Sequence, residues 1–116
     1  MQVVFLDSKT PSTARYTFEG ADIVEYGETA FADLADRCRH ADLLVTTIMP
    51  LRREILDYVT RPRHIVVPRQ HVSRLVEHEI ASQLEITVHA IDVDPSDWSQ
   101  FRNAALSVVL GIMSEK

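Results

Sequence analysis

The side chains best suited to ligand chemistry lie in a short turn that follows an apolar segment, within the sequence VVPRQHVSRL. Arg69, Gln70 and His71 in this turn offer a fixed positive charge, an amide and a titratable imidazole. Thr46 and Thr47 follow an earlier apolar segment in the same way and offer two hydroxyls. If both segments are parallel strands of one sheet, their carboxyl ends meet at the edge where open α/β sheets bind small ligands. We therefore predict that these five residues bind a small carboxylate or a similar anion.

His71 is the candidate catalytic residue of this set, because an imidazole beside an arginine can abstract a proton from an acidified carbon atom. The histidines at positions 40, 64, 78 and 89 have no spacing typical of a metal motif. His71 and His78 would lie about 10 Å apart along a helix, which is too far to bind one ion. We therefore expect no metal site.

The motifs of several enzyme classes are absent from the sequence. Gly20, Gly27 and Gly111 are too far apart to form the glycine-rich turn of a dinucleotide site or a phosphate loop. No serine stands in the G-x-S-x-G context of a nucleophile elbow. The single cysteine, Cys38, lies on the apolar side of a helical pattern, which favours a core position. We therefore expect no bound cofactor.

Composition and charge narrow the class of protein further. The chain has 116 residues, of which 46% are hydrophobic and 25% are charged, as in an ordinary globular domain. This length suits a single domain, since most domains contain roughly 100 to 150 residues. The formal net charge of −5 argues against nucleic acid or an anionic membrane as the main partner. The N-terminal apolar run lacks a basic start, and the lone cysteine suits a reducing compartment, so we expect a cytoplasmic protein.

Strand-like and helix-like segments alternate along the chain. Short runs rich in valine and isoleucine predict buried strands at Val3–Leu6, Ile23–Tyr26, Leu43–Thr46, Ile65–Val67 and Ile86–Ile91. Apolar residues at helical spacing predict helices around Phe31–Cys38, Leu51–Val59 and Val72–Leu84. Ser8–Gly20 contains a proline and scattered hydroxyls, which indicate a loop. This order predicts a flavodoxin-like three-layer α/β sandwich with a five-stranded parallel sheet, as one domain over residues 1–116 with its core in 1–91.

An extra C-terminal helix is expected at residues 98–114, after a polar turn in which Ser96 or Asp97 can cap it. Its sequence AALSVVLGIM places apolar groups on more than one face. Burial of one large aliphatic side chain is worth roughly 1.5 to 3 kcal/mol, so this helix should be covered. It either lies across its own sheet or forms a homodimer or docks another protein. The predicted interface residues are Phe101, Leu106, Val109, Leu110 and Met113.

The segment ADLLVTTIMPLRREILDYV, followed by RHIVV, resembles the N-terminal substrate domain of the D-isomer-specific 2-hydroxyacid dehydrogenases. In that family a strand ends in a threonine-containing loop, after which a helix and a further strand follow. VVFLD is similar to the family's first strand, ASQLEITVHAI to a later segment, and FRNAALSVVLGIMSEK to the helix that leads into the nucleotide domain. The resemblance covers nearly the whole chain and rests on the order and spacing of these pieces.

The chain departs from that family where the resemblance would imply catalysis. The family's Rossmann domain, with its nucleotide site and catalytic residues, has no counterpart before Lys116, so we expect no hydride transfer by this polypeptide alone. In the family, a glycine-rich loop after the fourth strand approaches the substrate carboxylate. Gln70 and Val72 stand at the glycine positions of that loop, and Glu85 replaces the glycine before the fifth strand.

Several functions are compatible with these observations. The principal hypothesis is a dehydrogenase-like domain that has lost hydride transfer and binds a small anion through Arg69, Gln70 and His71. An alternative is an interaction module that uses the apolar C-terminal helix for a homodimer or another protein. Further alternatives are a subunit of a split dehydrogenase, whose nucleotide-binding half is a separate chain, and a cofactor-independent enzyme with His71 as its base.

Overall fold

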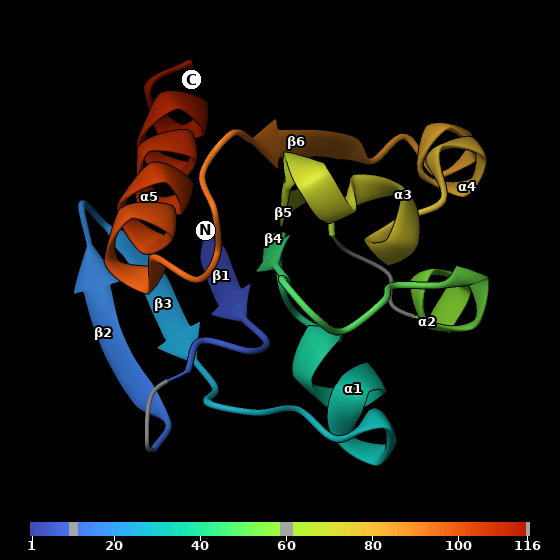
Figure 1. Ribbon diagram of the computed structural model, residues 1–116, viewed down its shortest axis with the longest axis horizontal. Helices are drawn as coiled ribbons and strands as arrows, with labels where there is room; N and C mark the ends of the chain where they lie inside the picture. The colour runs from blue at the N-terminus through green and yellow to red at the C-terminus, as the bar shows by residue number, and fades with distance from the viewer. Residues whose placement is uncertain (10–11, 59–61, 116) are drawn as a thin grey trace.

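The alternation of strands and helices is confirmed in the computed structural model, which describes residues 1–9, 12–58 and 62–115 (Figure 1). The strands are β1 (Gln2–Phe5), β2 (Ala14–Phe18), β3 (Ala21–Glu25), β4 (Leu43–Val45), β5 (His64–Pro68) and β6 (Thr87–Ile91). The helices are α1 (Phe31–Cys38), α2 (Arg53–Tyr58), α3 (Val72–Leu75), α4 (His78–Gln83) and α5 (Trp98–Ser114), with a 3-10 turn, η1 (Arg69–His71), before α3.

These strands form one mixed sheet in the order β2-β3-β1-β4-β5-β6. β3, β1, β4, β5 and β6 run parallel, whereas β2 pairs with β3 in the antiparallel sense at one edge. The sheet therefore has one strand more than the five predicted, and it is not wholly parallel. The connection from β1 to β3 runs through this edge strand, where a flavodoxin-like fold would place a helix.

The unpredicted strand β2 belongs to a tight hairpin with β3. Phe18 is opposite Ala21, so the loop contains only Glu19 and Gly20. Both loop residues have positive φ, 51° and 90°, as the favoured two-residue hairpin turn requires. The residues of β2 alternate between half-buried and exposed, because one of its faces packs and the other meets solvent. This period of two in ARYTF, followed by a glycine, is the sequence signal that identifies the hairpin.

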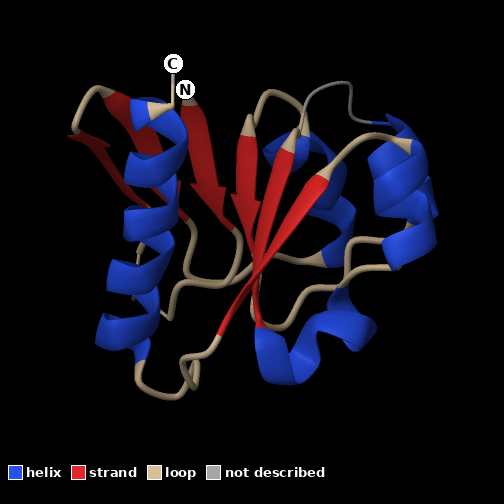
Figure 2. Ribbon diagram, turned by 90° about the horizontal axis from the view of Figure 1, so that it is seen from above, coloured by secondary structure: helices blue, strands red, loops and turns tan. Residues whose placement is uncertain are grey.

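Helices cover both faces of the sheet, so the molecule has three layers (Figure 2). Helices α1 to α4 pack on one face, with Leu34, Leu56, Leu75 and Ile80 in the core on that side. Helix α5 lies on the opposite face over a second core. The coarse prediction of a three-layer α/β protein is confirmed.

The helix predicted over residues 72–84 is divided into α3 and α4. Val76 separates them with extended backbone angles, φ −141° and ψ 133°, and forms an isolated parallel bridge with Leu51. The amide of Leu51 donates to the carbonyl oxygen of Leu75 at 2.8 Å. A β-branched residue adopts this extended conformation at little cost, and the bridge joins the segment after β4 to the segment after β5.

Helix α5 has the predicted bounds and lies across its own sheet. The side chain of Asp97 accepts a hydrogen bond from the amide of Gln100 and caps the helix, as one of the two predicted caps. Phe101, Ala105 and Val109 form a stripe at a spacing of four residues and are fully buried. The apolar character of this helix is thus largely explained within the chain. In the described parts of the chain, no helix has both the length and the apolar character that crossing a membrane requires.

Candidate functional site

The loop that follows β4 is held by the buried carboxylate of Asp7, which follows β1. Oδ1 of Asp7 accepts hydrogen bonds from the backbone N–H and the hydroxyl of Thr47, both at 2.9 Å. Oδ2 accepts hydrogen bonds from the backbone N–H groups of Ile48, at 2.9 Å, and Met49, at 3.0 Å. The hydroxyl of Thr46 lies 3.1 Å from Oδ2 and 2.6 Å from the carbonyl oxygen of Met49, so these two acceptors share its one proton.

This contact follows from the order of the strands. β1 and β4 are parallel neighbours with Phe5 opposite Val45, so the residues that follow them emerge side by side. Consecutive backbone N–H groups that point to one place form a concavity for an anion. Here the protein supplies the anion itself, through Asp7. Thr46 and Thr47, which we predicted to bind a ligand, are buried, and their hydroxyls serve this internal contact instead.

The turn after β5 is exposed and lies outside this buried cluster. Nε of Arg69 lies 2.7 Å from Oδ1 of Asp92 in a surface ion pair. The side chains of Gln70 and His71 contact each other at 3.3 Å. Arg69 and Gln70 line a pocket of about 290 Å³ together with residues 91–94, and neither His71 nor either threonine is part of its lining. The predicted site is therefore divided between two loops, and its arginine is paired with Asp92 at the surface.

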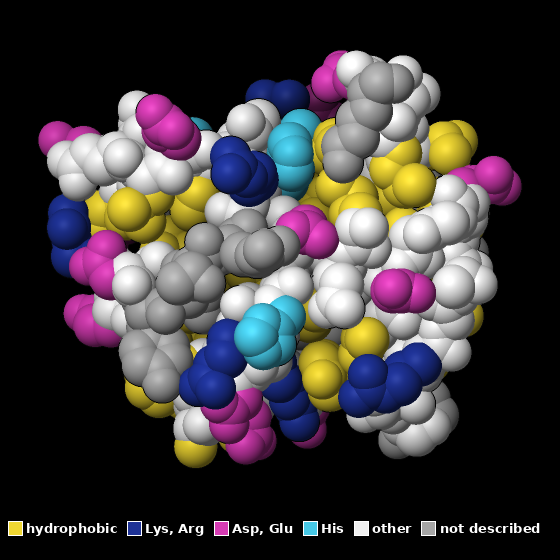
Figure 3. Space-filling view, turned by 180° about the vertical axis from the view of Figure 1, so that it is seen from behind, with side chains coloured by type: hydrophobic (Ala, Val, Ile, Leu, Met, Phe, Trp, Pro, Cys, Tyr) yellow, Lys and Arg dark blue, Asp and Glu magenta, His cyan; other side chains and the backbone are white. Residues whose placement is uncertain are grey.

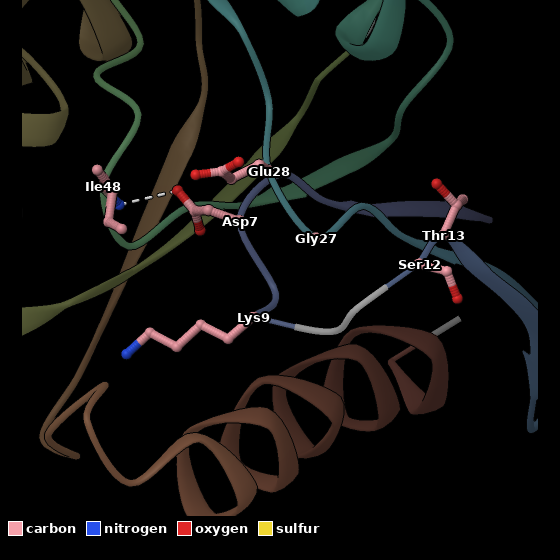
Figure 4. Close-up of a pocket in the computed structure, with 7 residues that line it drawn as sticks. All are labelled: Asp7, Lys9, Ser12, Thr13, Gly27, Glu28 and Ile48. Atoms are coloured by element: carbon pink, nitrogen blue, oxygen red, sulfur yellow. Dashed lines mark hydrogen bonds between the residues drawn. The ribbon is translucent and has the colours of Figure 1, made fainter.

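A larger crevice opens between the loops that follow β1, β3 and β4 (Figure 4). Its volume is about 620 Å³, and its lining is Asp7, Lys9, Ser12, Thr13, Gly27, Glu28 and Ile48. An adjoining pocket of about 320 Å³ shares three of these residues and adds Thr29, Ala30 and Met49. The chain leaves β1 toward β3 and leaves β4 toward β5, on opposite sides. This divergence is a topological switch point, where open α/β sheets bind ligands.

The crevice combines two opposite charges with an apolar side chain. In Figure 4, Lys9 and Glu28 extend toward the end of the crevice at Ile48, and Ser12 and Thr13 lie at the other end. Glu28 is exposed to solvent, and within the described part of the chain its carboxylate has no hydrogen-bond or ion-pair partner. Ile48 is 65% exposed and offers an apolar side chain at this end of the crevice. This end of the crevice can thus contact an acceptor, a donor and an apolar group at once.

The backbone at Lys9 is in an unfavourable conformation. Its φ is 58°, in the left-handed region that residues other than glycine seldom adopt. Its ammonium group donates to the carbonyl oxygen of Pro95 at 3.1 Å, which ties the loop after β1 to the loop before α5. A residue held in this region costs of order 1–3 kcal/mol, and such residues concentrate at functional sites.

A second buried carboxylate, Glu25, lies at the end of β3 on the α5 face. Its side chain accepts hydrogen bonds from the hydroxyl of Ser8 at 2.7 Å, from Nε of Arg102 at 3.0 Å and from the hydroxyl of Tyr16. Burial and the neighbouring carboxylate raise the pKa of Tyr16. Because Ser8 follows Asp7 directly, this cluster also fixes the chain that forms the floor of the crevice.

Sequence reasoning missed Asp7, Lys9 and Glu28, although a signal for one of them was present. Asp7 comes directly after the first predicted strand. The polar residues that we predicted to bind a ligand follow later strands in the same way. Glu28 follows β3 only after two further residues, and the role of Lys9 depends on the path of its loop. Cys38 is fully buried as predicted, and burial raises the pKa of its thiol to about 12.

The predicted interface residues of α5 differ in their exposure. Phe101 and Val109 are fully buried in the core beneath the helix, whereas Leu106 and Met113 are half-buried. Leu110 is 45% exposed. A second chain docking on this helix would therefore meet Leu110 first, and Phe101 and Val109 already pack against the sheet.

Comparisons with known proteins add no identification to this geometry. The sequence matches no protein-family model and no curated protein. Within residues 1–9, 12–58 and 62–115, no three His, Cys, Asp or Glu side chains form a group that could hold a metal ion.

Proposed function

We propose that this protein is a small-molecule-binding domain and that its site is the crevice between the loops that follow β1 and β4. The observation that supports the proposal is the unpaired carboxylate of Glu28, with Lys9 and the exposed Ile48, in one crevice at a topological switch point. Hydrogen bonds to Asp7 join the loops after β1 and β4 at the floor of this crevice, and a cavity with a few polar groups is typical of ligand sites.

The chemistry of these side chains suggests the class of ligand. Lys9 can pair with a carboxylate, and Glu28 can accept a hydrogen bond from an adjacent hydroxyl or ammonium group. Ile48 and Met49 offer an apolar surface for an aliphatic substituent. A small 2-hydroxy or 2-amino acid carries all three features. The amides of the β4 loop take no part in this recognition, because Asp7 already accepts their hydrogen bonds.

Two features support the further proposal that the domain is related to the substrate domain of the D-isomer-specific 2-hydroxyacid dehydrogenases. Along the sheet, the parallel strands follow the chain order 2-1-3-4-5, which is the flavodoxin-like order. Glu85 has a φ of 59°, a conformation that favours glycine, and the resemblance implies a glycine at this position. The sequence has no dinucleotide fingerprint, so on this proposal the chain binds its ligand without transferring hydride itself.

Thermal and chemical unfolding of the full chain in the presence of single compounds tests the binding proposal. The panel consists of 2-hydroxy, 2-amino and 2-oxo acids with aliphatic side chains, together with inorganic phosphate. A compound at a hundred times its dissociation constant should raise the free energy of unfolding by about 2.7 kcal/mol. We expect this increase with a 2-hydroxy or 2-amino acid, and a smaller one with the matching 2-oxo acid, which cannot donate to Glu28.

Matched variants locate the site. Lys9→Gln should abolish the stabilisation by the ligand and Glu28→Gln should reduce it, whereas Arg69→Gln in the exposed turn should preserve it. Stabilisation that is lost in Arg69→Gln and retained in Lys9→Gln would move the site to the turn after β5. If no compound in the panel stabilises the wild type, the proposed ligand class is wrong.

A further inference from the structure

Two histidines from neighbouring strands meet on the face of the sheet that carries α5. His64 begins β5, and His89 lies at the centre of β6. Val66 is opposite His89 and lies two residues after His64, so all three side chains point to one face. Val66 belongs to the core beneath α5, which places both imidazoles on that side. The sequence spacing alone does not indicate this pair.

The two rings are oriented with nitrogens facing each other. Nδ1 of His64 lies 3.0 Å from Nε2 of His89, and the ring planes are inclined by 34°. Without a bound ion, one ring donates its N–H to the other. The same separation also allows both nitrogens to bind a single cation that lies off the line between them.

Different coordination geometries require different separations of the two nitrogens. Zinc and similar ions bind imidazole nitrogen at about 2.0–2.1 Å. Two such nitrogens in adjacent positions of a square-planar or tetragonal ion, at about 90°, are about 2.9 Å apart, whereas a tetrahedral angle separates them by about 3.3 Å. The separation of 3.0 Å, which an ordinary hydrogen bond between the rings also gives, lies within about 0.1 Å of the tetragonal value, so the pair can accept such an ion with little movement. This geometry and these ligands are typical of Cu²⁺ and Ni²⁺.

The surroundings of the pair leave it open to an ion. Both histidines are half-buried, so part of each side chain reaches solvent. The space-filling view shows histidine side chains at the surface of one face of the molecule (Figure 3). Burial lowers the pKa of both imidazoles, while the carboxylate of Glu115 acts in the opposite direction on each. His64 also feels the charges of Arg63 and Asp42. No third ligand completes the group within the described residues, so water would fill the remaining positions.

We propose that His64 and His89 bind a tetragonal divalent cation, Cu²⁺ or Ni²⁺, and that the bound ion ties the edge strand β6 to β5. This site is distinct from the crevice, because it lies on the α5 face of β5 and β6 and not among the loops after β1, β3 and β4. An ion held by both strands stabilises the native chain, since the unfolded chain does not keep the two imidazoles together. The other strand edge of the sheet, β2, has no such pair in its described residues.

Titration of the full-length chain with Ni²⁺ and with Cu²⁺ tests this site, followed by calorimetry and by the unfolding temperature. We expect saturable binding of one ion per chain, stronger for Cu²⁺, with a rise in the unfolding temperature. His64→Gln and His89→Gln should each abolish both signals. His40→Gln and His78→Gln change exposed histidines and should retain them.

The electron paramagnetic resonance spectrum of Cu²⁺ bound to the wild type provides a readout that does not depend on folding of the variants. Coupling to two equivalent imidazole nitrogens is expected if the pair holds the ion. Coupling to a single nitrogen, binding that survives in the His64→Gln/His89→Gln double variant, or no saturable binding at all would each overturn the proposal.

Discussion

The loops after β4 and β5 leave the same edge of one sheet, yet they are organised in opposite ways. The β4 loop directs its backbone amides inward to the buried carboxylate of Asp7. The β5 turn directs Arg69 outward to Asp92, and this ion pair is exposed on both sides. Both loops carry residues that suit ligand chemistry by type. The difference shows that a polar residue at a strand end can serve the fold or the surface, and residue type does not decide which.

Burial is the physical origin of the difference. A hydrogen bond to a charged group contributes about 1.5–3 kcal/mol, and a buried donor without a partner costs about 1–3 kcal/mol. An exposed ion pair is screened by water and salt and contributes about 0–1 kcal/mol. The hydrogen bonds of the β4 loop should therefore contribute strongly to the stability of the fold, whereas the ion pair of the β5 turn should contribute little.

The largest effect should come from Asp7→Asn, which keeps the shape of the side chain and removes its charge. Both oxygens of Asp7 accept hydrogen bonds, whereas asparagine has only one acceptor oxygen. The NH₂ group of the asparagine would face N–H or O–H donors of the β4 loop, and these buried donors would lose their acceptor. We expect the free energy of unfolding to fall by more than about 3 kcal/mol. Urea unfolding followed by circular dichroism measures this change.

Asp92→Asn, which removes the charge that pairs with Arg69 of the β5 turn, is the matched control for Asp7→Asn, and it should change the free energy of unfolding by less than about 0.5 kcal/mol. Equal losses in the two variants would contradict the distinction between the loops.

A smaller effect is expected from Arg102→Ala, which removes a partner of the second buried carboxylate, Glu25. This variant tests whether a buried carboxylate also needs its partners for stability outside the β4 loop. Glu25 is fully buried, and the side chain of Arg102 is 40% exposed. Solvent weakens the direct attraction, so most of the cost comes from the loss of a partner to a buried carboxylate, about 2 kcal/mol in total. Arg15→Ala on the exposed side of β2 is the control and should cost less than about 0.5 kcal/mol. An Arg102→Ala protein as stable as that control would show that Ser8 and Tyr16 satisfy Glu25 alone.

The smallest effect is expected from Arg69→Ala. Because the ion pair with Asp92 is exposed, the free energy of unfolding should change by less than about 0.5 kcal/mol. The free energies of unfolding of the wild type and the variant should become more similar as the salt concentration rises, because salt screens the exposed ion pair. A loss above about 1 kcal/mol would show that the turn after β5 also contributes to the fold.

The strands and α5 were predictable because their patterns are local. Runs of valine and isoleucine indicated strands buried on both faces, and Asp97 indicated the start of α5. The edge strand β2 was missed, since Pro11 and scattered hydroxyls outweighed its alternation of half-buried and exposed residues. The interruption at Val76 was missed because the helical spacing of apolar residues continues across it, and the bridge to Leu51 lies far away in the sequence.

The candidate site was less predictable than the fold. Residue type correctly marked the strand ends as the polar edge of the sheet, but it selected Thr46 and Thr47, whose hydroxyls the protein uses internally. Glu28 and Lys9 became candidates only once the loops after β3 and β1 were seen to line one crevice.

The sequence by itself determined the class of fold, the positions of the parallel strands and the length of the last helix. Hydrophobic periodicity and capping depend on residues close together in the sequence, so these features can be predicted from short segments. Only the tertiary structure decided that Asp7 accepts hydrogen bonds from the backbone N–H groups of the β4 loop. It also decided that Glu28 remains unpaired and that His64 contacts His89. Each of these outcomes depends on strand order and register, which bring together residues distant in the sequence, and burial then determines which of their charges are satisfied.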